Sequence, residues 1–311
     1  GFFLFTNKSK LSDVPESGEL VRWMSQKQMQ YQEISLAGAK EFGVLEEYEK
    51  LQTEKCRPFN RITINGDILI KEPLDKQGET LAIREATWYE KASQHKIDIL
   101  PKVYEINPLK MEFIKGKNIY ECKLDYKEKK KILHKLVLAI QELHKTETIA
   151  TDYFSMKEAY FNKTMDRLSK IQDLVPFVKE REILINGKKC RNIFYHKREL
   201  EKLLDKLTCD KFVFIHGDCT FSNLMLRENG DPRGYFGFTE LYGDERYDWA
   251  KLYYSIVGNY DRFNLKKFSL DIEENEVKLQ IESNAWEDME EDFFAMTGAD
   301  KKEIQLLHAV I

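Results

Sequence analysis

A carboxylate and an amide lie five residues apart in the sequence HGDCTFSN, which occupies residues 216–223. The strand-like residues 211–215 run directly into this segment, and Gly217 permits a tight turn there. Transfer of a phosphoryl group from a nucleotide needs such a pair, because a carboxylate orients the attacking hydroxyl and accepts its proton while an amide oxygen helps to hold Mg²⁺. We therefore predict that Asp218 is the catalytic group and that Asn223 is a metal ligand.

The segment resembles the catalytic loop of the aminoglycoside phosphotransferase and choline kinase group. Further stretches follow that pattern in the same chain order, so the resemblance covers about residues 57–260: ILIK at 68–71, a glutamate on the next predicted helix, MEFI at 111–114 before Gly116, and GD with YDWAKL at 243–252. The resemblance implies an α+β, bilobal, protein-kinase-like fold with a small strand-rich N-lobe and a larger helical C-lobe.

The resemblance also assigns nucleotide-binding residues. Lys71 matches the strand lysine that grips the α- and β-phosphates, and Glu85 matches the glutamate that pairs with this lysine. Glu112, Phe113 and Ile114 resemble the hinge between the lobes, whose backbone meets adenine. The implied cofactors are ATP or GTP, with Mg²⁺. Taken singly, Lys71 and Glu85 also fit ordinary solvent-facing positions of a strand and a helix.

Two residues are implied to support the loop. In this family the histidine corresponding to His216 supports the loop, and the aspartate corresponding to Asp248 supports it from the following helix. Asp248 also fits a simple helix N-cap, because an apolar run follows this residue. A cluster of aromatic residues favours a core role and leaves open the wall of an acceptor pocket, where ring faces could hold a cation. Its members are Tyr235, Phe236, Phe238, Tyr242 and Trp249.

The second metal ligand is the main departure from the family pattern. The candidate is Asp231, in a DPRG sequence that resembles capsule-biosynthesis relatives, but it follows Asp218 more closely than the pattern expects. One interpretation is that the chain is natively short here and Asp231 is the ligand. The other is that residues between about 229 and 234 are missing, in which case Asp231 is only a turn residue.

The elements that must position these residues follow from periodicity and turn signals. Residues 57–71 predict a β-hairpin around Asn65-Gly66, because both turn residues tolerate positive φ. Apolar residues at helical spacing, among them Leu133, Leu136 and Ile140, predict a buried helix stripe after residue 116. We further expect helices at about 79–94, 157–173 and 198–207, from 247 and from 286, and a strand pair at 102–105 and 110–114.

We divide the chain into residues 51–116 as the N-lobe, 117–311 as the C-lobe, and 1–50 as a segment outside both lobes. That segment is either an N-terminal extension or the remnant of a preceding nucleotidyltransferase-like domain, fused or a partner, since residues 35–48 faintly resemble the closing part of such enzymes. The chain begins without Met and stops within an apolar helical pattern, so we expect a piece of a longer protein.

The amino-acid composition excludes several classes of protein. The 311 residues are 42% hydrophobic and 12% aromatic with few Gly and Pro, which excludes a disordered or fibrous chain. A net charge of −4 gives no argument for nucleic acid, and no apolar run is long enough to span a membrane. The five cysteines are scattered and lack metal-binding spacing, which favours the cytoplasm.

The resulting hypothesis is a small-molecule kinase that phosphorylates a hydroxyl of a sugar, an amino alcohol or a polysaccharide precursor, with capsule biosynthesis as one setting. The alternative is a nucleotide-binding pseudokinase that serves as an interaction module because its metal site is incomplete. A protein kinase is disfavoured, since His-Arg-Asp and Asp-Phe-Gly sequences are absent. An aminoglycoside would need acidic residues around the acceptor, and we can assign none.

Overall fold

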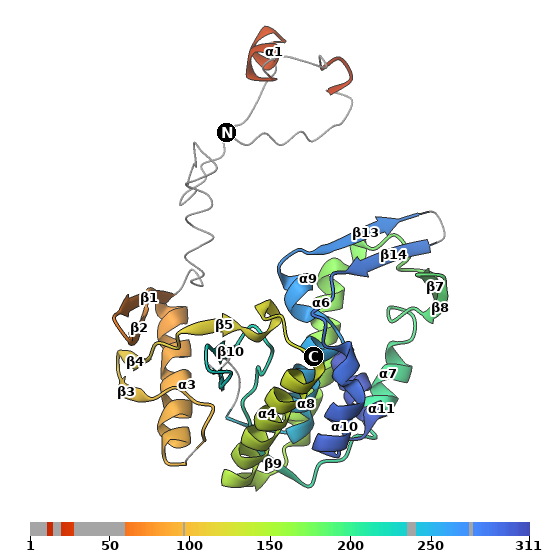
Figure 1. Ribbon diagram of the computed structural model, residues 1–311. Helices are drawn as coiled ribbons and strands as arrows, with labels where there is room; N and C mark the ends of the chain where they lie inside the picture. The colour runs from red at the N-terminus through yellow and green to blue at the C-terminus, as the bar shows by residue number, and fades with distance from the viewer. Residues whose placement is uncertain (1–10, 15–19, 28–59, 96, 235–240, 274–275) are drawn as a thin grey trace. The chain divides into compact units, whose positions relative to one another are not determined.

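The computed structural model describes residues 11–14, 20–27, 60–95, 97–234, 241–273 and 276–311 (Figure 1). The chain forms two compact units, Gly1–Lys55 and Cys56–Ile311. Apart from residues 51–55 of the N-lobe, both predicted lobes fall within the second unit. The first unit contains helix α1 (Leu20–Gln26), in which Trp23 is buried. Most of the segment 1–50, and residues 57–59 ahead of the predicted hairpin, lie outside the described residues.

The N-lobe is a four-stranded antiparallel sheet with one helix against it. The strands have the order β1-β2-β4-β3, with β1 (Asn60–Asn65), β2 (Ile68–Pro73), β3 (Val103–Ile106) and β4 (Leu109–Glu112). Gly66 has a φ of 62° in the turn between β1 and β2, so the predicted hairpin and strand pair are confirmed. Helix α3 (Lys76–Ser93) begins one turn earlier than expected, because the Asp75 side chain accepts from the Gly78 amide at 2.7 Å.

Trp88 on α3 joins the two lobes. Its side chain is fully buried and stacks on Phe214 of the C-lobe, with the ring centroids 5.3 Å apart. The indole Nε1 donates to the Ile215 carbonyl oxygen at 2.8 Å. The small core around Trp88 also includes Leu143 of the C-lobe, so one hydrophobic cluster spans both lobes.

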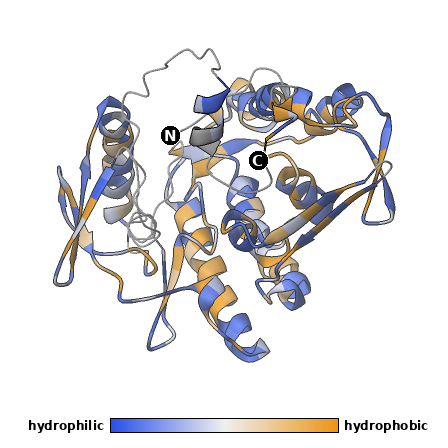
Figure 2. Ribbon diagram, turned by 90° about the horizontal axis from the view of Figure 1, so that it is seen from above, coloured by the Kyte–Doolittle hydropathy of each residue, from blue (hydrophilic) through white to orange (hydrophobic). Residues whose placement is uncertain are grey.

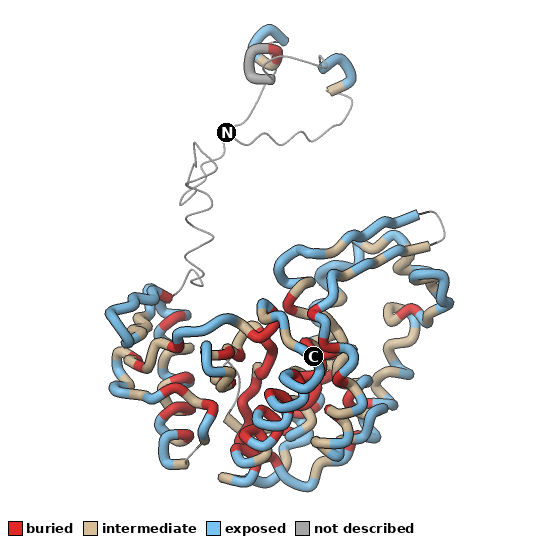
Figure 3. Tube along the Cα trace, in the orientation of Figure 1, coloured by how far each residue is buried: buried red, intermediate tan, exposed pale blue. Residues whose placement is uncertain are grey.

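The larger core lies in the C-lobe around α4 (Tyr126–Thr146), whose buried face is the predicted apolar stripe. Figure 3 shows the buried residues gathered along α4 and the chain beside it, and Figure 2 shows that the helices carry both hydrophobic and hydrophilic residues. Other helices that contribute buried residues to this core include α8 (Glu245–Ile256), η5 (Glu287–Met289), α10 (Glu290–Thr297) and α11 (Lys301–His308). The short helix α9 (Tyr260–Asn264) follows α8 and adds no hydrophobic residue to the core. The predicted helical tail is therefore confirmed.

Two small sheets flank the loop of residues 215–223, here named the 215–223 loop. One has the order β12-β9-β6, with β6 (Thr148–Ala150), β9 (Lys211–Phe214) and β12 (Tyr242–Gly243). The other has the order β11-β10-β5, with β5 (Gly116–Asn118), β10 (Leu224–Arg227) and β11 (Pro232–Gly234); the turn η2 (Ile119–Glu121) follows β5. The loop therefore begins where β9 ends and ends where β10 begins.

A nearly continuous helical run replaces the single helix predicted at 157–173. It consists of α5 (Tyr153–Lys157), the π-helical turn η3 (Glu158–Asn162), α6 (Lys163–Ile171) and the 3₁₀ turn η4 (Gln172–Leu174). The helix predicted at 198–207 is α7 (Lys197–Leu204). A π-helical turn inside a helix is uncommon and is often found at functional sites.

A third C-lobe sheet was not expected from the sequence. Its order is β13-β14-β7-β8, with β7 (Glu182–Ile185), β8 (Lys188–Arg191), β13 (Phe268–Ile272) and β14 (Glu276–Ile281). The β7–β8 turn is Asn186-Gly187, with φ values of 48° and 71°, the same signal that predicted the N-lobe hairpin. The expected α+β fold with a strand-rich N-lobe and a helical C-lobe is confirmed, and none of the described helices is long and apolar enough to cross a membrane.

Candidate active site

The 215–223 loop brings the predicted catalytic carboxylate and metal ligand together. The Asn223 Nδ2 donates to the Asp218 backbone oxygen at 2.9 Å and to the Asp218 Oδ2 at 2.8 Å. The other carboxylate oxygen, Oδ1, lies 3.4 Å from the Lys251 Nζ. The Asn223 Oδ1 accepts no hydrogen bond from any described residue, which leaves a neutral oxygen of the kind Mg²⁺ takes as a ligand.

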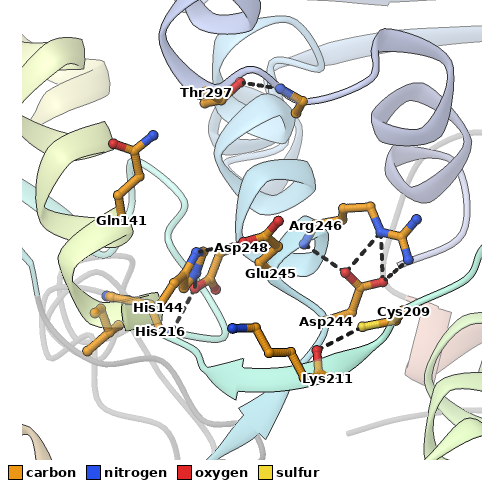
Figure 4. A network of polar contacts seen from close by, with 12 residues as sticks. Gln141, His144, Cys209, Lys211, His216, Asp244, Glu245, Arg246, Asp248 and Thr297 are labelled. Carbon is orange, nitrogen blue, oxygen red and sulfur yellow. Dashed lines mark hydrogen bonds and ion pairs between the residues drawn. The ribbon is translucent and has the colours of Figure 1, made fainter. Parts of the chain in front are cut away.

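Asp248 holds the first half of the loop (Figure 4). Its carboxylate is fully buried and accepts hydrogen bonds from the His216 amide at 2.8 Å and the Gly217 amide at 2.7 Å. The His144 Nε2, from α4, lies 2.9 Å from the same carboxylate. The N-cap interpretation of Asp248 is wrong, because α8 begins at Glu245 behind Asp244 as its cap.

The electrostatics of this support are those of the charged Asp248 carboxylate and the neutral imidazole of His216. Burial alone would raise the pKa of Asp248, but the hydrogen bond and charge of His144 and the Gly217 amide outweigh it and hold this pKa below its ordinary value. Burial lowers the pKa of His216, which keeps the ring neutral near pH 7. The Asp218 amide donates to the His216 Nδ1 at 3.3 Å, so His216 makes a backbone contact within the loop.

The second half of the loop is held by two further polar side chains. The Asn118 Nδ2, at the end of β5, donates to the Ser222 carbonyl oxygen at 2.7 Å. The Phe221 amide donates to the Ser255 Oγ of α8 at 2.9 Å, and Ser255 is fully buried. The loop is therefore fixed on both sides of Asp218, whose own side chain stays about a quarter exposed at 24%.

Lys71 and Glu85 meet in the N-lobe as the resemblance implied. The Lys71 Nζ of β2 donates to the Glu85 Oε2 of α3, and Glu85 is buried at 8% exposure. A buried carboxylate without a cation would be costly, so the pair keeps the lysine in one place. The structure thus brings these two residues together and leaves the Lys71 side chain partly exposed, at 24%.

The hinge residues connect β4 to β5 and are engaged within the protein. The Glu112 amide donates to the Lys102 oxygen and the Phe113 amide to the Asp67 oxygen, both at 2.8 Å, while the Glu112 side chain forms an ion pair with Arg227. Ile114 is buried at 1% exposure. Two of the amides predicted to face adenine therefore already have backbone partners.

Asp231 does not lie beside Asn223. It is in the turn between β10 and β11, where its carboxylate pairs with the Arg233 Nη2 at 2.8 Å and the Lys135 Nζ at 3.4 Å. Asn223 precedes the opposite end of β10, because Leu224 pairs with Gly234. Asp231 lies opposite Arg227, and at about 3.3 Å of rise per residue the four residues from Asn223 to Arg227 separate the two backbone positions by roughly 13 Å. Among the described residues, no group of three or more His, Cys, Asp or Glu could hold a metal ion.

A cavity of about 240 Å³ adjoins the loop at Ile215. Tyr242 of the aromatic cluster lines this cavity, whereas Trp249 is buried in the core at 3% exposure. Tyr235, Phe236 and Phe238 lie outside the described residues. The described lining residues are Ser155, Met156, Ala159, Tyr160, Lys163, Phe212, Ile215, Tyr242, Gly243, Asp244 and Tyr247.

Three supporting residues were missed by sequence reasoning. His144 ends the apolar stripe of α4, and a histidine on a buried helix face signals a polar partner in the core. Trp88 fits an apolar helix position in the same way. The one sequence signal for its role is that a buried indole N–H usually needs a hydrogen-bond acceptor, which here is the Ile215 carbonyl oxygen. Lys251 belongs to the YDWAKL stretch, but its position beside Asp218 depends on the fold.

The chain was compared with known protein sequences and solved structures. No curated protein sequence matches the chain. Among solved structures, the chain is similar to the ADP-bound aminoglycoside phosphotransferase APH(2'')-Ib, with 19% identity, 85% of each chain covered and a TM-score of 0.47. It is also similar to an APH(2") enzyme solved with GDP and kanamycin, with 14% identity, 93% of this chain and 87% of that chain covered and a TM-score of 0.47. A third similar structure is APH(3'')-Id from Streptomyces rimosus, with 15% identity, 85% and 96% covered and a TM-score of 0.41.

The sequence model of the phosphotransferase enzyme family matches residues 82–268, which is more than half of the chain. The matched range includes Glu85, the 215–223 loop and Asp248. The chain belongs to the phosphotransferase enzyme family.

Proposed function

We propose that this phosphotransferase moves the γ-phosphoryl group of ATP or GTP to a hydroxyl of a small acceptor, which is a sugar, an amino alcohol or a polysaccharide precursor. The observation that carries the proposal is the arrangement of Asp218 and Asn223 on a loop fixed from both sides. Positioning and charge stabilisation supply most of the catalysis in such reactions, so a rigid loop fits this chemistry.

Asp218 is the proposed catalytic residue. Its Oδ2 is held by the Asn223 amide, and its Oδ1 faces Lys251, so the carboxylate is oriented by two donors. In this position it orients the acceptor hydroxyl and takes up the proton as the oxygen attacks phosphorus.

The nucleotide and the metal are assigned to three parts of the chain: the Lys71–Glu85 pair, the hinge and Asn223. Lys71, held by Glu85, is the proposed contact to the α- and β-phosphates, and the hinge residues 112–114 are the proposed neighbours of the base. Mg²⁺, when bound with the nucleotide, neutralises phosphate charge. We assign it to the Asn223 Oδ1, which no described residue occupies as a donor.

A second candidate function is a nucleotide-binding pseudokinase that acts as an interaction module. One observation favours it: Asp231, the proposed second metal ligand, pairs with two cations at the far end of β10 from Asn223. An Asp231→Asn variant tests whether Asp231 is a metal ligand. A metal role predicts that the Mg²⁺ concentration for half-maximal turnover rises at least tenfold, and an unchanged value would remove Asp231 from the site.

The proposal is tested by Mg²⁺-dependent release of ADP and GDP against sugars, choline, ethanolamine and aminoglycosides. Asp218→Asn is the control, and it should lower turnover by orders of magnitude while nucleotide affinity stays within a few-fold. Acceptor-stimulated release that the variant loses would support the kinase. Turnover that is unchanged in the variant would refute the role of Asp218, and nucleotide binding without any turnover would support the pseudokinase.

A cytoplasmic location is part of the proposal. The cysteines found as free thiols in the described chain are Cys122, Cys190, Cys209 and Cys219, which suits a reducing compartment. ATP and GTP are also abundant there.

A further inference from the structure

Two cations on one face of α6 have no acidic partner within the part of the chain that the structure describes. Lys163 and Arg167 are four residues apart, so they lie one helical turn from each other on the same side of the helix. Neither forms a hydrogen bond or ion pair with a described residue, whereas Lys170 on the same helix pairs with Asp166 at 2.6 Å. Like charges at this spacing destabilise a helix slightly. An anionic partner from outside the described chain would offset the repulsion between Lys163 and Arg167.

These cations belong to the surroundings of Asp218. Partial desolvation and the positive charges of Arg167 and Lys251 lower the pKa of Lys163, and the negative charge of Asp218 opposes that effect. Burial is the main cause that raises the pKa of Tyr254, to about 12, and Arg167 and Asp218 also act on this tyrosine. The geometry connects the same groups: the Lys251 Nζ lies 3.4 Å from the Asp218 Oδ1 and 5.7 Å from the centre of the Tyr247 ring, and Tyr247 lines the cavity together with Lys163.

The cavity next to the loop carries the same sign of charge. Lys163 lines the cavity. Asp244 is the acidic residue among the lining residues that the structure describes, and its carboxylate pairs with the Arg246 guanidinium at 2.7–2.9 Å. Tyr160 and Tyr247 stack along its wall with ring centroids 6.3 Å apart. Among the described lining residues, an acceptor bound here would meet aromatic faces and the Lys163 ammonium, while the one carboxylate, that of Asp244, is already paired with Arg246.

We propose that the acceptor carries a carboxylate or phosphate group in addition to the hydroxyl that is phosphorylated, and that Lys163 and Arg167 bind this anionic group. The inference rests on the proposed function, because it names the substrate class of the same site. A cavity of about 240 Å³ is smaller than the roughly 300–1,000 Å³ of pockets for drug-sized ligands, so the acceptor is small. Polycationic acceptors are disfavoured by the same charges.

The test compares acceptors that differ in charge but share a scaffold. Glucose, glucuronate and glucose 6-phosphate form one series, glycerol and glycerol 3-phosphate a second, and kanamycin is the polycation. Nucleoside diphosphate release is measured for the natural chain and for Lys163→Gln, Arg167→Gln and the matched control Lys170→Gln. We expect an anionic member to be preferred in a series, with its KM raised at least tenfold by the first two substitutions and unchanged by the control.

Each contrary result has a defined meaning. Preference for neutral or cationic acceptors would overturn the inference while leaving the kinase intact. A raised nucleotide KM at a constant acceptor KM would also overturn it, because Lys163 and Arg167 would then hold the nucleotide phosphates. Comparison of glucuronate with glucose 6-phosphate distinguishes a carboxylate from a phosphate.

If no compound is turned over, the proposed function fails and equilibrium binding decides the inference separately. Glucuronate and glucose 6-phosphate are titrated calorimetrically into protein saturated with MgADP, which keeps the nucleotide site filled. Binding that Lys163→Gln and Arg167→Gln weaken at least tenfold, and that Lys170→Gln leaves unchanged, would support the anion site without catalysis. Absence of binding, or binding that is insensitive to both substitutions, would overturn it.

Discussion

Replacing Asp248 with asparagine removes the charge that fixes the 215–223 loop while keeping the size of the side chain. The carboxylate is fully buried and accepts from the His216 amide, the Gly217 amide and His144, at 2.7–2.9 Å. An amide has one oxygen, so its NH₂ group must face at least one of these donors. A hydrogen bond to a charged group contributes about 1.5–3 kcal/mol, and a buried donor left unpaired costs about 1–3 kcal/mol.

These costs are partly offset, because the variant no longer buries a charge. The pKa of Asp248 lies below its ordinary value despite complete burial, which means that the favourable contacts exceed the desolvation cost. We therefore expect Asp248→Asn to lower the free energy of unfolding by roughly 2–4 kcal/mol, a large share of the about 5–15 kcal/mol of a typical domain. Urea unfolding at pH 7.5 measures this change as a shift of the midpoint at constant slope.

The same variant should lower turnover at least tenfold, because the loop that carries Asp218 loses its support. Nucleotide affinity should stay within a few-fold, since Lys71 and Glu85 do not contact Asp248. Glu245→Gln is the matched control: this residue shares the first turn of α8, its side chain is 59% exposed, and it comes only within 3.9 Å of His144. Equal losses in both variants, or a loss below about 0.5 kcal/mol for Asp248→Asn, would refute the reasoning.

Three other predictions follow from contacts around the loop. Lys71→Met should weaken nucleotide binding at least tenfold in a fluorescence titration, because a charged contact to phosphate is lost, whereas Lys110→Met on the neighbouring strand should not. Trp88→Phe leaves the buried Ile215 carbonyl without its donor and should cost about 1–3 kcal/mol in urea unfolding, with a cost near zero arguing against the inter-lobe bond. Burial lowers the pKa of His216, so the unfolded state binds a proton below about pH 6.5 that the folded state excludes; the melting temperature should fall from pH 7.5 to 5.5, and a rise would contradict this sign.

Local signals predicted the parts of the fold that depend on neighbouring residues. The Asn65-Gly66 sequence predicted the first hairpin as a local turn signal. In the structure Asn65 pairs with Ile68, so the two turn residues are Gly66 and Asp67, and Gly66 takes the positive φ. The strand before His216 and the stripe of α4 were predicted for the same reason, since alternation and helical spacing are visible within one element. Asn186-Gly187 carries the same hairpin signal and could have been used in the same way.

Non-local pairing explains what the sequence did not reveal. Strand β14 pairs in parallel with β7, which lies about ninety residues earlier, and nothing within either strand identifies its partner. The same holds for the support of the loop, since His144 and Asp248 are separated by 104 residues. For Asp231 the local pattern was misleading. Its residue type and approximate spacing suited a metal ligand, but the register of β10 and β11 places it beside Lys135.

The contacts of the 215–223 loop indicate why so many elements are needed to present one carboxylate. Trp88 from the N-lobe holds the start of the loop, Asp248 holds its turn, and Asn118 and Ser255 hold its end. Each of these groups bonds to loop backbone, so the loop is fixed whichever side chain occupies position 218. Asp218 is then available for chemistry, because among the described residues its carboxylate forms a hydrogen bond only with Asn223 and an ion pair only with Lys251. This division of roles predicts that substitutions at the four supporting positions change stability and turnover together, whereas Asp218→Asn changes turnover with little change in stability.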